Sequence, residues 1–283
     1  MQKIQSFIWF NDNAEEAAKL YTSLYKNSHI VSTTPGPGGS VMGVTISLNG
    51  IEIILLNGGD YYKPTPGISH TIYCNSEDEI NSLWGALSAG GNIMMNFADY
   101  PWAKKYGWTN DKYGVSWQFT LTDEIKPVAP SLLFAGNVQG RAQEALNLYT
   151  SLFPDSKINI VSRYEAGENG PEGKIKFSSF SLCGQDFIAM DSGVPMDNLF
   201  TPGMSLFVNC ESQEEVDRLW DTLGEGGRFD RCGWLQDKFG VSWQIVPTIL
   251  GRLLGGQDKA RAGRAMQAML GMGKLDIAVL EAA

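Results

Sequence analysis

Asp111-Lys-Tyr-Gly-Val-Ser-Trp-Gln-Phe119 returns later in the chain as Asp237-Lys-Phe-Gly-Val-Ser-Trp-Gln-Ile245. The two stretches differ only at their third and last residues, which is far more similarity than chance would give. A segment with helical spacing is repeated as well, because Leu20-Tyr-Thr-Ser-Leu24 returns as Leu148-Tyr-Thr-Ser-Leu152. An internal duplication of this length decides the architecture, since both copies must fold into the same unit.

The duplication divides the 283 residues into two homologous halves, 1–123 and 131–248. Between them, Glu124-Ile-Lys-Pro-Val-Ala-Pro130 carries two prolines in seven residues, which indicates a short and stiff linker. The remaining residues, 249–283, form a tail rich in Ala, Leu and Met. A chain of this length is expected to fold as two compact units, each with its own core.

Each half reads as two successive βαβββ modules. Ile4–Phe10 is rich in β-forming residues, and alanines at helical spacing follow it. Asn49-Gly50 joins two β-type runs, which is the strongest short-range signal for a hairpin. Ser76 is an expected helix cap, and Gly90-Gly91 an expected helix end. Four modules of this kind predict an α+β protein, with two tandem domains of mixed sheet and a helical tail.

Composition excludes several classes of function. Thirty-one acidic and 22 basic residues give a net charge of −9, so phosphate backbones would repel the chain and nucleic acid is not an expected partner. Apolar runs such as Ile51–Leu56 are far shorter than the roughly 20 residues of a membrane-spanning helix. The N-terminus lacks the features of a signal peptide, so a cytoplasmic protein is expected. The four cysteines contain no CxxC pair and are expected to be reduced thiols, and Cys74, Cys183 and Cys210 are expected to be buried as small apolar residues.

Two repeated sequence segments resemble those of a known family. They are Glu15-Glu-Ala-Ala-Lys-Leu-Tyr21, repeated as Gln143-Glu-Ala-Leu-Asn-Leu-Tyr149, and the two Gly-Val-Ser-Trp-Gln segments. With paired βαβββ modules, they resemble the vicinal-oxygen-chelate (glyoxalase, bleomycin-resistance and dioxygenase) superfamily. The likeness is strongest to its PhnB-like branch, often labelled 3-demethylubiquinone-9 3-methyltransferase. The resemblance implies a curved sheet around a cavity, where many members bind a divalent metal that chelates neighbouring oxygens of a substrate.

The resemblance also implies where metal ligands would lie. In the first half the ligand positions fall on Gln5, His70 and Gln118, and in the second on Pro130, Leu206 and Gln244. Only the imidazole is a strong donor, and amide oxygens hold divalent ions more weakly than carboxylates do. A cofactor is therefore not specified, and a divalent metal is disfavoured.

The methyltransferase label has no support in these residues. Common adenosyl-methionine enzymes place a Gly-rich turn after an apolar strand at the head of a parallel sheet. Here the Gly-rich stretch Gly36-Pro-Gly-Gly39 lies between two β-type runs and is expected to be a loop.

Further candidates come from single residues. Gln118 and Gln244 alternate with their neighbours along expected strands, and each supplies an amide that either orients a ligand or bonds nearby backbone groups. Trp234 is expected at the rim of a pocket. Cys232 is the best candidate for a reactive thiol, although only Arg228 and Arg231 lie near it in sequence. Asp111 and Asp237 are expected to bond their own turns.

The tail from 249 to 283 predicts short amphipathic helices that pack on the body or on a second subunit, which would give a homodimer. The preferred hypothesis is a small-molecule-binding protein without a strong metal site, whose reaction is not specified. The ligand pocket would include Gln5, His70, Gln118, Gln244 and Trp234, and His70 and Cys232 are the candidate catalytic residues. One alternative is a metal-dependent lyase, isomerase or dioxygenase that uses His70. Another is a structural or interaction module.

Overall fold

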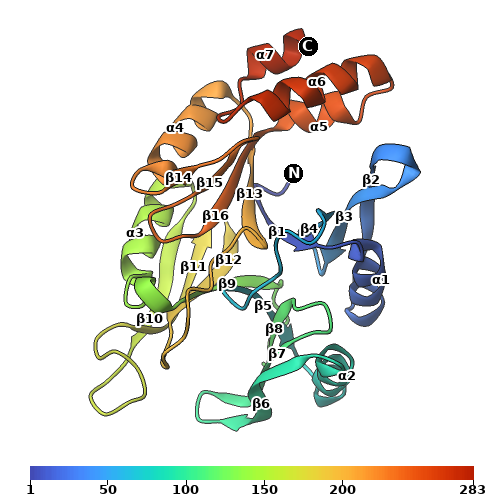
Figure 1. Ribbon diagram of the computed structural model, residues 1–283. Coiled ribbons are helices and arrows are strands. Elements are labelled where there is room, and N and C mark those ends of the chain that lie inside the picture. Colours follow the sequence, from blue (N-terminus) through green and yellow to red (C-terminus); the bar gives the residue numbers. More distant parts are fainter. The chain divides into compact units, whose positions relative to one another are not determined.

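The computed structural model describes residues 1–283, apart from the side chain of Pro37. The chain forms two compact units, a larger one of residues 7–204 and a smaller one of residues 1–6 and 205–283. A strand, a helix and three further strands follow one another four times, and three helices end the chain (Figure 1). The predicted α+β fold, its four modules and its helical tail are confirmed.

Modules one and two have the predicted order of elements, and β1 spans the residues predicted for it. Module one contains β1 (Ile4–Phe10), α1 (Ala14–Leu24), β2 (His29–Pro35), β3 (Val41–Leu48) and β4 (Ile51–Asn57). Module two contains β5 (Ile68–Cys74), α2 (Glu77–Ser88), β6 (Asn92–Tyr100), β7 (Ala103–Asn110) and β8 (Ser116–Leu121).

The second repeat has the same order. Module three contains β9 (Ala129–Phe134), α3 (Ala142–Leu152), β10 (Lys157–Arg163), β11 (Ile175–Leu182) and β12 (Gln185–Asp191). Module four contains β13 (Met204–Cys210), α4 (Gln213–Gly224), β14 (Arg228–Phe229), β15 (Trp234–Gln236) and β16 (Ser242–Pro247). The tail contains α5 (Thr248–Leu254), α6 (Lys259–Gly271) and α7 (Ile277–Ala282). None of the helices in the described chain is long and apolar enough to cross a membrane.

One mixed sheet of the larger unit joins modules two and three. Its strand order is β10-β11-β12-β9-β5-β8-β7-β6. The first strands of the two modules, β5 and β9, pair antiparallel at its centre, whereas β5 and β8 run parallel. This sheet therefore combines the second module of one repeat with the first module of the next, while the boundaries 1–123, 131–248 and 249–283 remain a division made on the sequence.

Helices cover one face of this sheet around β8. Trp84 of α2 packs edge-on against Phe119, with ring centroids 5.8 Å apart. Tyr21 of α1 packs against Trp117 at 4.9 Å. Trp117 and Phe119 are two residues apart on β8 and therefore point to the same side. We call this side the helix face of module two.

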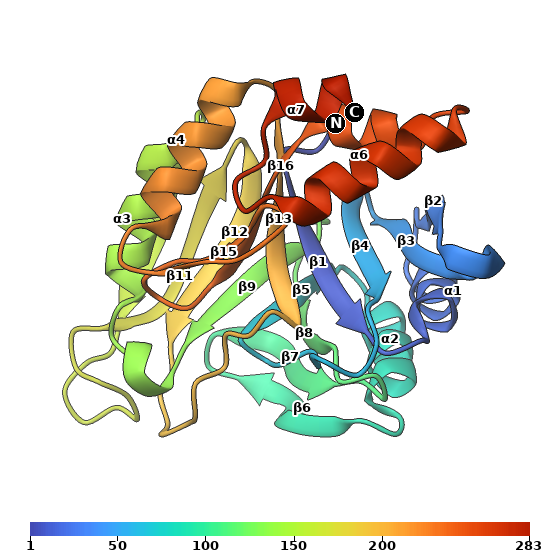
Figure 2. The same cartoon turned by 45° about the horizontal axis from the view of Figure 1, so that its top comes forward.

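In the smaller unit, the strand order β14-β15-β16-β13 repeats the arrangement of module two. β13 and β16 run parallel, and β15 pairs antiparallel with β16. Helix α4 is capped by Ser212, whose side chain accepts from the backbone N–H of Glu215, as Ser76 accepts from Glu79 on α2. The apolar side chains Val216, Leu219 and Leu223 are buried. Figure 2 shows helix α4 beside the strands of its own module and the tail helices near the ends of β13 and β16.

The repeated aspartates explain why the quoted stretch is kept in both halves. Asp111 accepts hydrogen bonds from the backbone N–H groups of Tyr113 and Val115 at 2.8 and 3.0 Å, and from the indole of Trp117 at 2.9 Å. Asp237 accepts from the corresponding residues at 2.9, 3.0 and 2.9 Å. Each carboxylate thus shapes its turn and anchors the tryptophan of the following strand. The predicted turn role is confirmed and extended.

Two hairpins use matching residues with left-handed backbone. Asn49 and Gly50 have φ of 49° and 87°, and Cys183 and Gly184 have φ of 50° and 75°. Two successive residues with positive φ are what a tight two-residue hairpin turn requires. Cys183, expected as a buried apolar residue, is instead a half-buried turn residue, because it occupies the position of Asn49. Cys74 and Cys210 are buried as predicted.

Candidate functional site

The register between β5 and β8 decides which predicted site residues can act together. Thr71 lies beside Gln118, and His70 lies beside Trp117. Because successive residues of a strand face opposite sides, Gln118 points away from the helix face and His70 points into it. The imidazole and indole rings of His70 and Trp117 lie 5.3 Å apart, in agreement with this placement.

Polar side chains gather on the side of the sheet opposite the helix face. They come from four neighbouring strands, β5, β7, β8 and β9, as the strand registers require. We call these residues the polar face of module two: Ser69, Thr71, Tyr106, Ser116, Gln118 and Ser131. Buried hydroxyl and amide groups each need a hydrogen-bond partner, so the side chains of this face are expected to bond one another.

The side chain of Gln118 is at the centre of the polar face and is only 3% exposed. Its Oε1 accepts from the phenol of Tyr106 at 2.8 Å, and its Nε2 donates to Ser69 Oγ at 2.8 Å. The hydroxyls of Thr71 and Ser131 lie 2.7 Å apart, within hydrogen-bond distance. The amide therefore bonds side chains rather than backbone groups, and it is held in one orientation by partners on β7 and β5.

Tyr106 is a hydrogen-bond donor in this arrangement. Burial raises the pKa of its phenol far above the ordinary value, so the group stays protonated at neutral pH. Trp108, two residues further along β7, donates its indole N–H to Ser116 Oγ at 2.7 Å. The polar face is thus a set of fixed neutral donors and acceptors.

An aromatic surface adjoins the polar face at the end of the β6–β7 hairpin. The rings of Tyr100 and Trp102 are stacked with centroids 4.8 Å apart, and Tyr106 stands edge-on to Tyr100 at 5.8 Å. Trp102 is 65% exposed. A large flat ring left in water beside a buried hydrogen-bonding amide is a suitable contact for the planar part of a ligand.

His70 is fully buried, and neither of its ring nitrogens has a hydrogen-bond partner among the described residues. Burial lowers the pKa of this imidazole to about 4, so the ring is neutral at physiological pH. Its side chain points away from Gln118. The structure therefore does not bring His70 and Gln118 together, and it places His70 in the core under the helices.

The predicted metal ligands do not form one site. His70 and Gln118 lie on opposite faces of their sheet, as their register requires. Gln5 belongs to β1, which is not a strand of that sheet, and its Oε1 accepts from Asn209 in the smaller unit at 3.1 Å. Within the described residues, no three His, Cys, Asp or Glu side chains are grouped as metal ligands. The structure therefore does not bring Gln5, His70 and Gln118 together, and their donor set does not fit a divalent cation.

Module four contains the counterpart of the polar face in part. Gln244 Nε2 donates to Ser205 Oγ at 3.1 Å, as Gln118 donates to Ser69. Trp234 lies beside Gln244 in the β15–β16 register and is half-buried. Cys232 stands where module two has Tyr106, so module four lacks the phenol that donates to the amide.

Cys232 does not have the environment of a nucleophile. Burial raises the pKa of its thiol, and the nearby charge of Arg231 offsets this only in part. A reactive cysteine requires a lowered pKa. Its backbone N–H donates to the carbonyl of Met272 at 2.8 Å, and its φ is 59°. The structure therefore gives Cys232 no feature that activates its thiol and places it in a tight turn that contacts the tail, and its catalytic role stays a prediction.

The Gly-rich stretch 36–39 connects β2 and β3, which pair antiparallel. It is therefore a hairpin connection rather than a strand-to-helix turn of a parallel sheet, and it does not have the form of the usual binding site for adenosyl-methionine.

Sequence reasoning found Gln118 but missed the residues that hold it. Tyr106, Ser69 and Ser131 lie on three other strands, and only the strand registers bring them together. The sequence did contain one signal. The same two serines occur in both repeats, Ser69 and Ser116 in the first and Ser205 and Ser242 in the second.

Comparisons with known proteins agree with the duplication. A family model described as 3-demethylubiquinone-9 3-methyltransferase matches residues 2–120 and again residues 126–246. Protein YjdN of Escherichia coli (strain K12) is 28% identical over 138 residues, which are 42% of this chain and 93% of YjdN. The PhnB protein from Bacillus cereus is 40% identical and covers 43% of this chain and 100% of its own, with a TM-score of 0.41. Each of these proteins thus matches less than half of the chain.

A structural likeness extends over both repeats. Glyoxalase I from Zea mays covers 85% of this chain and 92% of its own length, with a TM-score of 0.57 and 10% identity, and at that identity the likeness concerns the fold alone. The chain therefore belongs to the family described as 3-demethylubiquinone-9 3-methyltransferase, in two tandem copies.

Proposed function

We propose that the protein binds a small, planar, oxygen-bearing organic molecule on the polar face of module two. The observation that carries the proposal is the buried amide of Gln118, fixed between the phenol of Tyr106 and the hydroxyl of Ser69. An amide held by neutral partners on both sides is positioned to recognise a ligand by shape and hydrogen bonding.

The hydrogen-bonding capacity of this amide supports the proposal. A glutamine side chain has two N–H donors and two acceptor lone pairs on its oxygen. The bonds to Tyr106 and Ser69 use one donor and one lone pair. One of each is left for a ligand that offers both an acceptor and a donor, such as a phenol, a hydroxy acid or a ring with neighbouring oxygens.

The stacked rings of Tyr100 and Trp102 favour a ligand with a flat ring. The family description names 3-demethylubiquinone, which is such a ring. Methyl transfer has no such support, because the Gly-rich stretch 36–39 lies in an antiparallel hairpin.

The donor set also supports binding without a tightly held divalent ion. The imidazole of His70 faces away from Gln118, and amide and hydroxyl oxygens alone hold divalent cations weakly. Metal analysis of the purified protein should therefore find less than one equivalent of Zn, Mn, Ni or Fe. A stoichiometric ion that is lost in the His70→Ala variant would contradict this part of the proposal.

Binding itself is tested by thermal unfolding with benzoate, catechol and a short-chain ubiquinone analogue. A compound at about 100 times its Kd should stabilise the folded chain by about 2.7 kcal/mol. The stabilisation should disappear in Gln118→Leu and remain in Gln244→Leu, the matched variant of module four. Equal loss in both variants, or retention in Gln118→Leu, would overturn the proposed site.

A further inference from the structure

The C-terminal tail packs on module four through an apolar cluster. Val246 of β16 is buried together with side chains of all three tail helices, and Phe207 of β13 packs against the same group. The tail members of the buried cluster are Leu250, Leu253, Ala265, Leu275 and Leu280. The tail is therefore part of the core of the smaller unit rather than a separate appendage.

The strand register shows which face of module four the tail covers. Phe207 lies beside Gln244, and Val246 is two residues further along β16. All three side chains therefore point to the same side of their strands. The tail packs on the face that carries Gln244, and this face corresponds to the polar face of module two.

Backbone hydrogen bonds attach the tail beside this face. The N–H groups of Cys232 and Gly233 donate to the carbonyls of Met272 and Gly273, both at 2.8 Å. Gly233 has a φ of 81°, and a Cβ at this position would lie 2.7 Å from the carbonyl oxygen of Ile245 and 3.2 Å from Leu275. Only glycine fits this close approach to β16, and Leu275 of the tail packs against the same turn.

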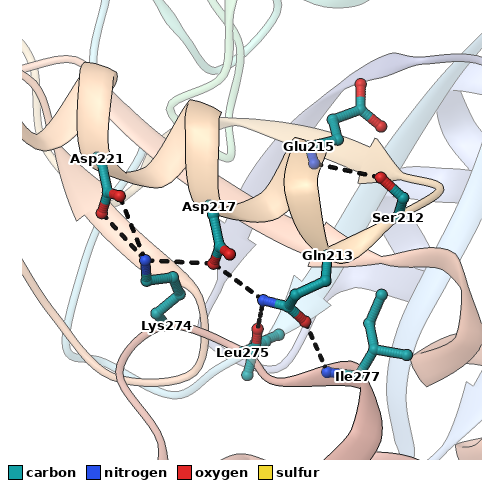
Figure 3. A network of polar contacts seen from close by, with 8 residues as sticks. All are labelled: Ser212, Gln213, Glu215, Asp217, Asp221, Lys274, Leu275 and Ile277. Atoms are coloured by element: carbon teal, nitrogen blue, oxygen red, sulfur yellow. Dashed lines mark hydrogen bonds and ion pairs between the residues drawn. The ribbon is translucent and has the colours of Figure 1, made fainter.

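Helix α4 holds the same segment from its outer side (Figure 3). The side chain of Gln213 donates to the carbonyl of Leu275 at 3.2 Å and accepts from the N–H of Ile277 at 2.8 Å. Lys274 pairs with Asp217 at 3.2 Å and with Asp221 at 3.1 Å. We call Gln213, Asp217, Asp221 and Lys274 the tail latch.

Module two lacks these features at the matching positions. The latch residues on α4 are spaced by four and so form one stripe of the helix, where α2 has Glu77, Asn81 and Gly85. Likewise Phe207 and Val246 stand where module two has Thr71 and Thr120. Each of these differences lies at a residue that contacts the tail in module four.

We infer that the tail occupies the ligand face of module four, so that the chain binds one ligand on module two and would bind a second only after release of the tail. This inference rests on the proposed function, because it assumes that Gln118 and Gln244 mark equivalent ligand faces. It assigns the two repeats different duties: one binds, and the other is closed by the chain itself.

The test uses the full chain and 8-anilinonaphthalene-1-sulfonate as a fluorescent planar probe. The wild type should bind one equivalent, and Gln118→Leu should remove it. In the latch variant Gln213→Ala with Lys274→Ala, the amides of Cys232, Gly233 and Ile277 should exchange hydrogen faster, and a second equivalent should bind. A further Gln244→Leu substitution should remove only that second equivalent. Glu77→Ala, at the position matching Gln213, is the control and should bind one.

The outcomes separate the two proposals. A wild type whose single equivalent ignores Gln118→Leu contradicts the proposed function. A wild type that binds two equivalents, one of them lost in Gln244→Leu, overturns the inference about the tail. A variant with a released tail that still binds only one equivalent of the probe also overturns the inference about the tail. If the latch variant keeps slow exchange, Leu280→Asp provides the release, because a charge does not stay in the apolar cluster.

Discussion

Modules two and four have the same order of elements and the same anchored tryptophan, yet the faces that carry Gln118 and Gln244 differ in kind. In module two, Gln118 is surrounded by Thr71, Tyr106 and Ser69. In module four, Gln244 lies among Phe207 and Val246, which the tail covers. Duplication kept the aspartates that shape the turns, Asp111 and Asp237, and the amides Gln118 and Gln244, but it changed the neighbours of these amides. Substitutions can therefore separate the effects of the shared residues that shape the fold from those of the residues that differ around the two amides.

Substitution of a shared residue that shapes the fold should have the largest effect on stability. Asp111→Ala removes the acceptor of three hydrogen bonds from Tyr113, Val115 and Trp117 and of a fourth from the phenol of Tyr21 at 2.6 Å. Buried donors left without a partner cost about 1–3 kcal/mol each, so a loss of about 4 kcal/mol or more in the free energy of unfolding is expected. Chemical denaturation measures it. A loss below about 1 kcal/mol would show that this turn does not hold β8.

His70 gives the next effect, and it is confined to acid pH. Its imidazole has a pKa of about 4 in the folded chain and about 6.5 when unfolded. The unfolded chain binds the proton first, so the free energy of unfolding should be highest above pH 6.5 and fall as the pH drops toward 4. The loss should reach about 3 kcal/mol.

The matched variant for this position is His70→Leu, because module four has Leu206 there. Leucine removes two unpartnered buried nitrogens, so the variant should be at least as stable as the wild type at neutral pH. Its stability should also depend less on pH between 6.5 and 4. An unchanged acid dependence in denaturation curves would show that other groups cause it.

A smaller effect is expected where module four is given the residue of module two. Phe207→Thr removes an aromatic ring from the tail cluster and should lower the free energy of unfolding by about 2 kcal/mol. Hydrogen exchange should increase at Cys232 and Gly233, whose N–H groups bond the tail. The reverse change, Thr71→Phe in module two, is the control and should leave tail exchange unaltered.

The smallest effect tests a feature that the modules share. Ser76 and Ser212 each accept a backbone N–H at 3.3 Å at the start of α2 and α4. Alanine at either position should cost about 1 kcal/mol of stability. Equal losses in thermal unfolding are expected, and a clear difference would mean that the capped helices contribute unequally to their units.

Much of this fold was predictable from local patterns. Apolar runs, the turn at Asn49-Gly50 and the cap at Ser76 gave strands and helices close to their observed ends, because those signals act within a few residues. The pairing of β5 with β9 was not predictable, since every module has a first strand with similar apolar residues and nothing local selects its partner.

The site was predictable only in part for the same reason. Alternation along β8 placed Gln118 and Trp117 on opposite sides, as observed. Whether His70 faced the amide or the indole depended on the register between β5 and β8, and a shift of one residue reverses the answer. The tail was predicted to be helical, but its contact with α4 depends on Gln213 and Asp217, which look like ordinary exposed polar residues.

A crystal structure of the protein soaked with the compound that stabilises it most would test the central claim directly. We expect the ligand to lie against module two, with an oxygen about 3 Å from the amide of Gln118, and the tail helices to remain packed on Phe207 and Val246 of module four. A ligand beside Gln244 with the tail in place, or a cation coordinated by His70, would contradict this account.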